Sequence, residues 1–169
     1  MPATIMKIPL VRRVAAWAVL LESWYFDKRN NVETQATREE QIAGMADVSA
    51  GFWYLPTRPT TVHMLLKDLP MDSLSDYTFV DIGSGKGRVL LIAAQYGFRR
   101  VVGVEFRREL HERALLNVQR WRASNPRSTN IECLNMNARD YIFPNEKLVL
   151  YLFNPFGDEI MKDVLGHLD

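Results

Sequence analysis

Apolar and polar positions alternate between strand-like and helix-like patterns in the second half of the chain. The stretches 88–96 and 108–122 repeat their apolar residues with a helical period, and Gly97 ends the first of them. Strands that alternate with helices build a parallel sheet. The pattern therefore predicts an α/β fold, a doubly wound parallel sheet with helices on both faces. Four short apolar runs have the length of its buried strands: residues 77–82, 101–105, 131–134 and 148–153.

The first 50 residues differ, and we expect them to form an α-helical extension ahead of a domain at residues 51–169. The apolar run before Glu22 is too short for the roughly 20 residues that cross a bilayer. With Arg12 and Arg13 beside it, such a helix can lie on a membrane surface. We favour packing on the rest of the domain or on another subunit. One helical stripe holds its apolar residues: Leu10, Val14, Trp17, Leu21 and Trp24.

Two more helices are expected between this extension and the first strand. Thr37 and Glu40 have the spacing of a capping box, which opens a short helix through Met45. Pro59 suits the first position of the next helix, which Pro70 ends.

Composition limits the class of protein. The 169 residues are 47% hydrophobic and 24% charged, as in one globular domain, and the single Cys133 fits a reducing cytoplasm. A net charge of +1 excludes a strongly basic nucleic-acid binder. Residues 86–139 nevertheless carry 11 basic and 4 acidic side chains. This basic block either attracts phosphate or an acidic partner, or forms the solvated faces of two helices, which is the commoner case.

A glycine-rich turn follows the first predicted strand, and an acidic residue ends the second. Such a turn lets the backbone approach a ligand, and the next helix offers unpaired N–H groups. A P-loop is excluded because Gly87 follows Lys86 and position 80 is valine. The dinucleotide fingerprint is excluded at its last glycine, where Arg88 stands. The remaining pattern consists of Asp81, Gly83, Ser84, Gly85 and Gly87, with Glu105 ending the second strand.

This pattern resembles the first two motifs of class I S-adenosylmethionine-dependent methyltransferases, which have a Rossmann-like fold. The resemblance covers residues 52–169 and implies S-adenosylmethionine as cofactor. It implies that Asp81 and the glycine turn hold the methionine part. It also implies that Glu105 binds both ribose hydroxyls, because a carboxylate accepts two charge-assisted hydrogen bonds.

The third family motif corresponds to Asn137 and Ala138, beside the adenine amino group. The family usually has an acid at this place. Asn137 therefore either bonds the adenine edge or, with Asp140, only begins the following turn.

Asn154, Pro155 and Phe156 are the predicted catalytic residues. They resemble a shortened Asn/Asp-Pro-Pro-Tyr/Phe motif of amino-group methyltransferases, in which the first side chain orients the target nitrogen and the aromatic residue packs on the substrate. A plain strand-ending turn is the alternative.

Upstream, the run 59–61 (Pro-Thr-Thr) resembles a helix start beside the cofactor in some ribosomal-protein methyltransferases. Tyr54 or Thr57 would then close over the cofactor, although a plain helix cap is favoured. His63, His111 and His167 have no metal-binding spacing, and no metal site is expected.

The resemblance implies methyl transfer to a nitrogen of a protein or a small molecule. An RNA or other nucleic-acid methyltransferase and an inactive cofactor-binding interaction protein are the alternatives. The family's sheet has seven strands, whereas four are found here, so the strand at 148–153 would lie at an edge. We expect either a truncated form of a longer enzyme, which we favour, or an edge covered by another chain or by the N-terminal region. Both predict a poorly soluble or oligomeric chain.

Overall fold

The four predicted strands form one parallel sheet in the computed structural model, which describes residues 10–40, 54–128, 130–153 and 157–168. Its order is β3-β2-β1-β4, so β4 lies at an edge of the described sheet, as predicted. Each observed strand agrees with its predicted run to within one residue at either end. The strands are β1 (Thr78–Ile82), β2 (Arg100–Glu105), β3 (Ile131–Asn135) and β4 (Leu148–Leu152).

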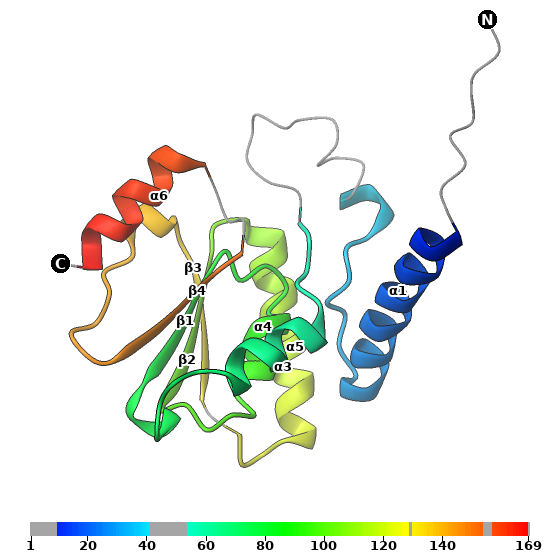
Figure 1. Ribbon diagram of the computed structural model, residues 1–169. Coiled ribbons are helices and arrows are strands. Elements are labelled where there is room, and N and C mark those ends of the chain that lie inside the picture. The colour runs from blue at the N-terminus through cyan, green and yellow to red at the C-terminus, as the bar shows by residue number, and fades with distance from the viewer. Residues whose placement is uncertain (1–9, 41–53, 129, 154–156, 169) are drawn as a thin grey trace, which may run out of the picture.

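Helices cover both faces of this sheet, which confirms the α/β, Rossmann-like doubly wound architecture (Figure 1). On one side lie α3 (Pro59–Lys67), α4 (Arg88–Ala93) and α5 (Arg108–Ser124), with α1 (Leu10–Asn30) outside them. On the other side lies α6 (Asp158–Leu165). Three short 3-10 turns complete the described elements: η1 (Leu74–Asp76), η2 (Ala138–Asp140) and η3 (Gly166–Leu168).

The alternation of side chains along each strand divides the core in two. Phe79 and Val101 point to the side of the three packed helices, where they meet Leu91 and Trp121. The alternate residues of β1 and β2 point to the opposite side and pack with Tyr141, Phe143 and the α6 residue Val164. β1 is buried along its whole length and β2 along most of it, and the residues that directly follow them, Gly83 and Phe106, are exposed.

Local signals place the helices that precede the sheet. The Thr37 amide donates to the Glu40 carboxylate at 2.7 Å and the Glu40 amide to the Thr37 hydroxyl at 3.2 Å, so the predicted capping box is formed. The continuation of that helix through Met45 lies outside the described residues. Pro59 begins α3, as predicted.

The predicted packing of the N-terminal apolar stripe on the rest of the domain is wrong for the three stripe residues whose side chains the structure describes, whereas packing on another subunit stays a prediction. Trp17, Leu21 and Trp24 are each more than half exposed. The inner face of α1 instead buries Ser23 and Asp27 with Phe26, because those polar groups bond to the start of α4 and to the segment after α1. No helix among the described residues is long and apolar enough to cross a membrane.

Gly103 lets the glycine turn and α4 approach β2 closely. A Cβ atom at this position would lie 2.5 Å from Cδ1 of Leu90 and 2.7 Å from Oγ of Ser84, well inside contact distance. A glycine within a strand commonly marks such an approach. The absence of a side chain at Gly103 therefore allows the turn and α4 to pack this closely against β2.

We predict that Gly103→Ala lowers the free energy of unfolding by about 1–3 kcal/mol, because Leu90 and Ser84 must both move. Gly166→Ala is the control, since a Cβ there meets open space and the backbone is helical with φ −63°. Urea unfolding of both variants checks this. Equal stability of the two variants would contradict the packing described for β2.

Candidate functional site

The carboxylate of Glu105 joins the ends of β1 and β2. Its side chain is buried, with Oε2 accepting from the Gly85 amide at 2.9 Å and Oε1 from the Arg107 amide at 2.8 Å. Burial raises the pKa of Glu105, while these N–H groups lower it. The side chain thus points to the glycine turn, where the sequence predicted it.

The backbone N–H groups of the turn are bonded mainly within the protein. Gly83 and Ser84 donate to the Val104 carbonyl at 2.8 and 3.1 Å, and Gly87 donates to the Ser84 carbonyl at 2.9 Å. The N–H groups of the turn itself are therefore mostly in use, and the predicted role of the N–H groups at the start of α4 stays a prediction. A ligand at the turn would meet its backbone, which has positive φ at the three glycines, and the acids beside it.

Asp81, near the end of β1, is buried close to Glu105. Burial first, and the negative charge of Glu105 second, raise the pKa of Asp81 from 3.8 to about 8. Two acids held together out of water disfavour a second negative charge and favour a cationic ligand. The two residues that the sequence singled out as acids therefore form one electrostatic unit.

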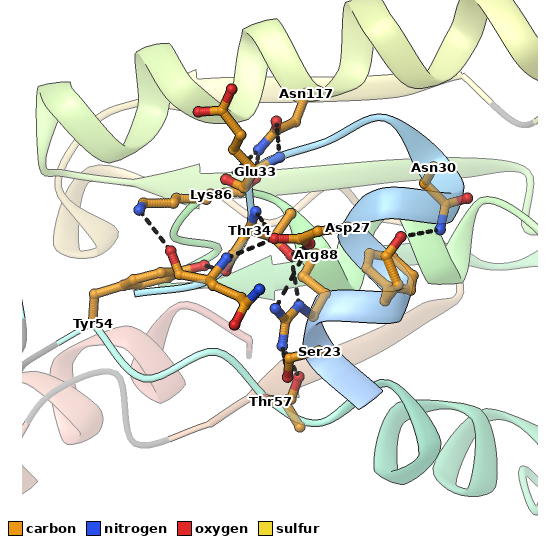
Figure 2. Close-up of polar contacts among 12 residues, drawn as sticks. Ser23, Asp27, Asn30, Glu33, Thr34, Tyr54, Thr57, Lys86, Arg88 and Asn117 are labelled. Atoms are coloured by element: carbon orange, nitrogen blue, oxygen red, sulfur yellow. Dashed lines mark hydrogen bonds and ion pairs between the residues drawn. The ribbon is translucent and has the colours of Figure 1, made fainter. Parts of the chain in front are cut away.

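Thr34 connects α1 to Arg88 and to Tyr54, beside the glycine turn (Figure 2). It is fully buried, and all its polar groups are bonded. Its amide and hydroxyl donate to the two carboxylate oxygens of Asp27 on α1. Its hydroxyl oxygen accepts from Nε of Arg88 at 2.7 Å, and its carbonyl accepts from the Tyr54 hydroxyl at 2.7 Å.

Arg88 is the first residue of α4 and is only 2% exposed. Besides Thr34, its guanidinium donates to the Ser23 hydroxyl at 3.1 Å and to the Thr57 carbonyl at 3.2 Å, and one nitrogen lies 3.8 Å from Asp27. Burial lowers the pKa of this guanidinium. One buried cation thus fastens α1 and the segment around Thr57 to the helix that follows the glycine turn.

Tyr54 covers the turn itself. A Cβ on Gly85 would lie 2.3 Å from Cε2 of Tyr54, so the ring rests directly on this glycine. Lys86 lies 5.1 Å from the ring centroid and donates to the Gln35 carbonyl and the Glu40 carboxylate, both at 2.8 Å. Tyr54 therefore lies beside the turn that is predicted to hold the cofactor, and its closing over a cofactor stays a prediction.

A hollow of about 410 Å³ lies beside the turn, between the N-terminal segment and the first turns of α5. None of the predicted cofactor residues that the structure describes borders it. Most of its charged groups are already paired: Lys86 with Glu40, and Arg113 with Glu33. The hollow is lined by Asp27, Glu33, Gln35, Ala36, Thr37, Glu40, Lys86, Glu109 and Arg113.

The end of β3 lies next to Glu105. Asn135 donates to the carbonyls of Glu105 and Phe106 at 2.8 and 3.1 Å. The oxygen of Asn137 caps η2 by accepting from the Arg139 amide at 3.0 Å, and Ala138 is buried. The cap agrees with the turn interpretation of Asn137, and its contact with adenine stays a prediction.

The remaining predicted residues form no second site within the described part of the chain. Asn154, Pro155 and Phe156 lie outside the described residues. His63 bonds the Tyr96 hydroxyl at 2.7 Å, and His167 lies 3.3 Å from the Tyr141 carbonyl. Within the described ranges no group of three or more His, Cys, Asp or Glu side chains can hold a metal ion.

Comparison with known proteins identifies the segment that carries this site. Residues 75–156 match the model of a family described as "Putative methyltransferase". Over these residues the chain is therefore similar to a methyltransferase family. The matched segment contains Asp81, the glycine turn, Glu105 and Asn137, so the predicted motifs and the family match coincide. No curated protein sequence matches this chain significantly.

Solved structures show the same fold around this segment. The YcgJ protein of Bacillus subtilis is 18% identical, with a TM-score of 0.51 over 64% of this chain and 44% of its own. A Thiobacillus denitrificans S-adenosylmethionine-dependent methyltransferase, solved with S-adenosylhomocysteine, is 16% identical, with a TM-score of 0.53 over 79% of this chain and 51% of its own. The present chain therefore spans about half the length of these structures.

The sequence pattern does not predict the contacts of Arg88 and Thr34 that hold the N-terminal segment beside the glycine turn. In the sequence, Arg88 marks only the start of a predicted helix and the end of the dinucleotide fingerprint, and nothing distinguishes Thr34. A signal was present, since an arginine at the first position of a helix whose other residues are all apolar invites the question of what pairs with it.

We predict that Asp81→Asn stabilises the protein without ligand, increasingly as pH rises. Between the unfolded value of 3.8 and the folded value of about 8, the folded chain keeps a proton that the unfolded chain has lost. The free energy of unfolding therefore falls over this range in the wild type, and the substitution removes that loss because an amide does not titrate. Urea unfolding at about pH 5 and about pH 8 measures the difference. A difference that does not grow with pH would contradict the raised pKa.

Proposed function

We propose that this chain is an S-adenosylmethionine-dependent methyltransferase that methylates a nitrogen of a protein or a small molecule. The observation that carries the proposal is the pair of buried acids, Asp81 and Glu105, beside a glycine turn at the carboxyl ends of β1 and β2. In an open α/β sheet this end of the strands is where ligands bind.

Charge supports the fit of this cofactor. S-adenosylmethionine has a sulfonium and an ammonium group, both positively charged. The pKa values of the two acids are both raised, so a bound cation would stabilise their charged forms. The carboxylate of Glu105 has about four acceptor positions, of which Gly85 and Arg107 use one on each oxygen. Two acceptor positions remain for the two ribose hydroxyls.

The residues of the chain would divide the work as follows. Asp81 and the turn hold the methionine part, Glu105 the ribose, and Asn137 with Ala138 the adenine. Tyr54 closes the turn against water. When bound, S-adenosylmethionine supplies an electrophilic methyl group, and transfer to an amine then depends chiefly on positioning. Asn154 would orient the acceptor nitrogen, with Pro155 and Phe156 shaping its pocket.

The charge pattern favours a protein or small-molecule acceptor over a nucleic acid. Most basic side chains of the block at 86–139 form ion pairs with acidic residues from outside the block. Glu33 pairs with Arg113 and Arg120, and Glu146 pairs with Arg99 and Arg100. Arginines that are already neutralised in this way grip phosphates poorly, so the RNA alternative loses its main support.

We predict that Glu105→Ala weakens the binding of S-adenosylhomocysteine by about 1.5–3 kcal/mol, or roughly 10–150-fold, the range for hydrogen bonds to a charged group. Glu112→Ala is the matched control, because this exposed acid pairs only with its helical neighbour Arg108 in the described structure. Isothermal titration calorimetry gives both dissociation constants. An unchanged constant for Glu105→Ala would remove the ribose role.

The methyl acceptor is found by incubating the protein with tritiated S-adenosylmethionine and fractionated lysate. We expect label in protein or small molecules, and we expect Asn154→Ala to lower the rate while cofactor binding stays nearly unchanged. Label in nucleic acid would favour the RNA alternative. Cofactor binding without any labelled product would favour the inactive interaction protein, and a folded sample that binds no cofactor would remove the proposal.

A further inference from the structure

The outer face of α1 is a continuous apolar surface without a partner in the described structure. It presents five large side chains on neighbouring helical turns, each at least half exposed. They are Trp17 (64%), Leu20 (53%), Leu21 (61%), Trp24 (52%) and Tyr25 (57%). Single exposed apolar residues are ordinary, whereas a contiguous group of this kind marks an interaction site. We call this group the α1 outer face.

The opposite face of α1 already has its partners, so the helix is held in place independently of any occupant of the outer face. Asp27 accepts from Thr34, and Ser23 accepts from Arg88. Glu22 accepts from Arg58 at 2.9 Å and from the Thr60 amide at 2.6 Å. Figure 1 shows α1 at the periphery of the molecule, outside α3 and α5.

The charges of α1 are sorted between the two faces. Glu22 and Asp27, its acidic residues, are both engaged on the inner side. Lys28 and Arg29 are exposed in the last turn, next to Tyr25, whose hydroxyl accepts from Arg29 at 3.2 Å. Among the described side chains of α1, the exposed charged groups are therefore basic.

We propose that the α1 outer face binds an anionic lipid surface. Tryptophan and tyrosine prefer the boundary between headgroups and acyl chains, leucines enter the apolar layer, and basic residues attract anionic headgroups. The helix would lie in the plane of the membrane surface and hold the domain there without crossing the bilayer. A second copy of the chain fits less well, because the described part of this face offers no carboxylate to Lys28 and Arg29.

The test is co-sedimentation of the whole chain with phosphatidylcholine vesicles, with and without phosphatidylglycerol. We expect binding to the anionic vesicles that weakens as salt is raised. The double variant Trp17→Gln/Trp24→Gln should lose about tenfold or more in partitioning. The matched control is Leu115→Gln/Leu116→Gln, which changes two exposed leucines of α5 and should bind like the wild type.

Quenching of wild-type tryptophan fluorescence by bromine-labelled lipid needs no substitution, and it keeps the test valid if the double variant does not fold. Strong quenching supports the proposal, because tryptophans outside the core would then reach the acyl chains, whereas Trp121, which is 1% exposed, stays protected inside the domain. Wild-type protein that stays in the supernatant at low salt overturns it, as does binding that the tryptophan substitutions leave unchanged. A dimer that the same substitutions dissociate, with no vesicle binding, assigns the face to a second copy.

Discussion

The burial of two carboxyl groups at the meeting point of β1 and β2 is the constraint on which the site depends. Glu105 can be buried there because the amides of Gly85 and Arg107 bond its two oxygens, and that bonding also fixes the glycine turn against β2. Asp81 shares the same low-dielectric region, which is why its pKa rises. The geometry of the turn and the raised pKa of Asp81 therefore both depend on the burial of Glu105.

The N-terminal segment completes the site from outside the sheet. Arg88 and Thr34 connect it to the start of α4 through buried hydrogen bonds. Removal of one partner leaves a buried polar group unpaired, which lowers the stability of the fold. Tyr54 depends on the same arrangement, since its hydroxyl bonds Thr34 while its ring rests on Gly85. Asp27 of α1, Thr34, Tyr54 and Gly85 thus form one chain of contacts, which connects α1 to the glycine turn although the two lie far apart in the sequence.

The strands and the acid-and-glycine motif could be predicted because both follow from local patterns. Apolar runs of strand length, and acids at the ends of β1 and β2, leave few alternatives in a parallel sheet. The orientation of α1 could not be predicted, because the periodicity shows an apolar stripe but does not show which face of the helix packs on the domain. The polar residues Ser23 and Asp27 decided it through a partner, Arg88, that lies far along the chain. The cover by Tyr54 likewise depends on long-range contacts that composition does not encode.

The most direct test of the central claim is a crystal structure of this chain with S-adenosylhomocysteine. We expect the nucleoside at the carboxyl ends of β1 and β2, with both ribose hydroxyls bonded to Glu105 and the ring of Tyr54 close to the ligand. A nucleoside bound elsewhere, with the Glu105 carboxylate bonded only to backbone amides, would contradict the assignment of these strand ends as the cofactor site.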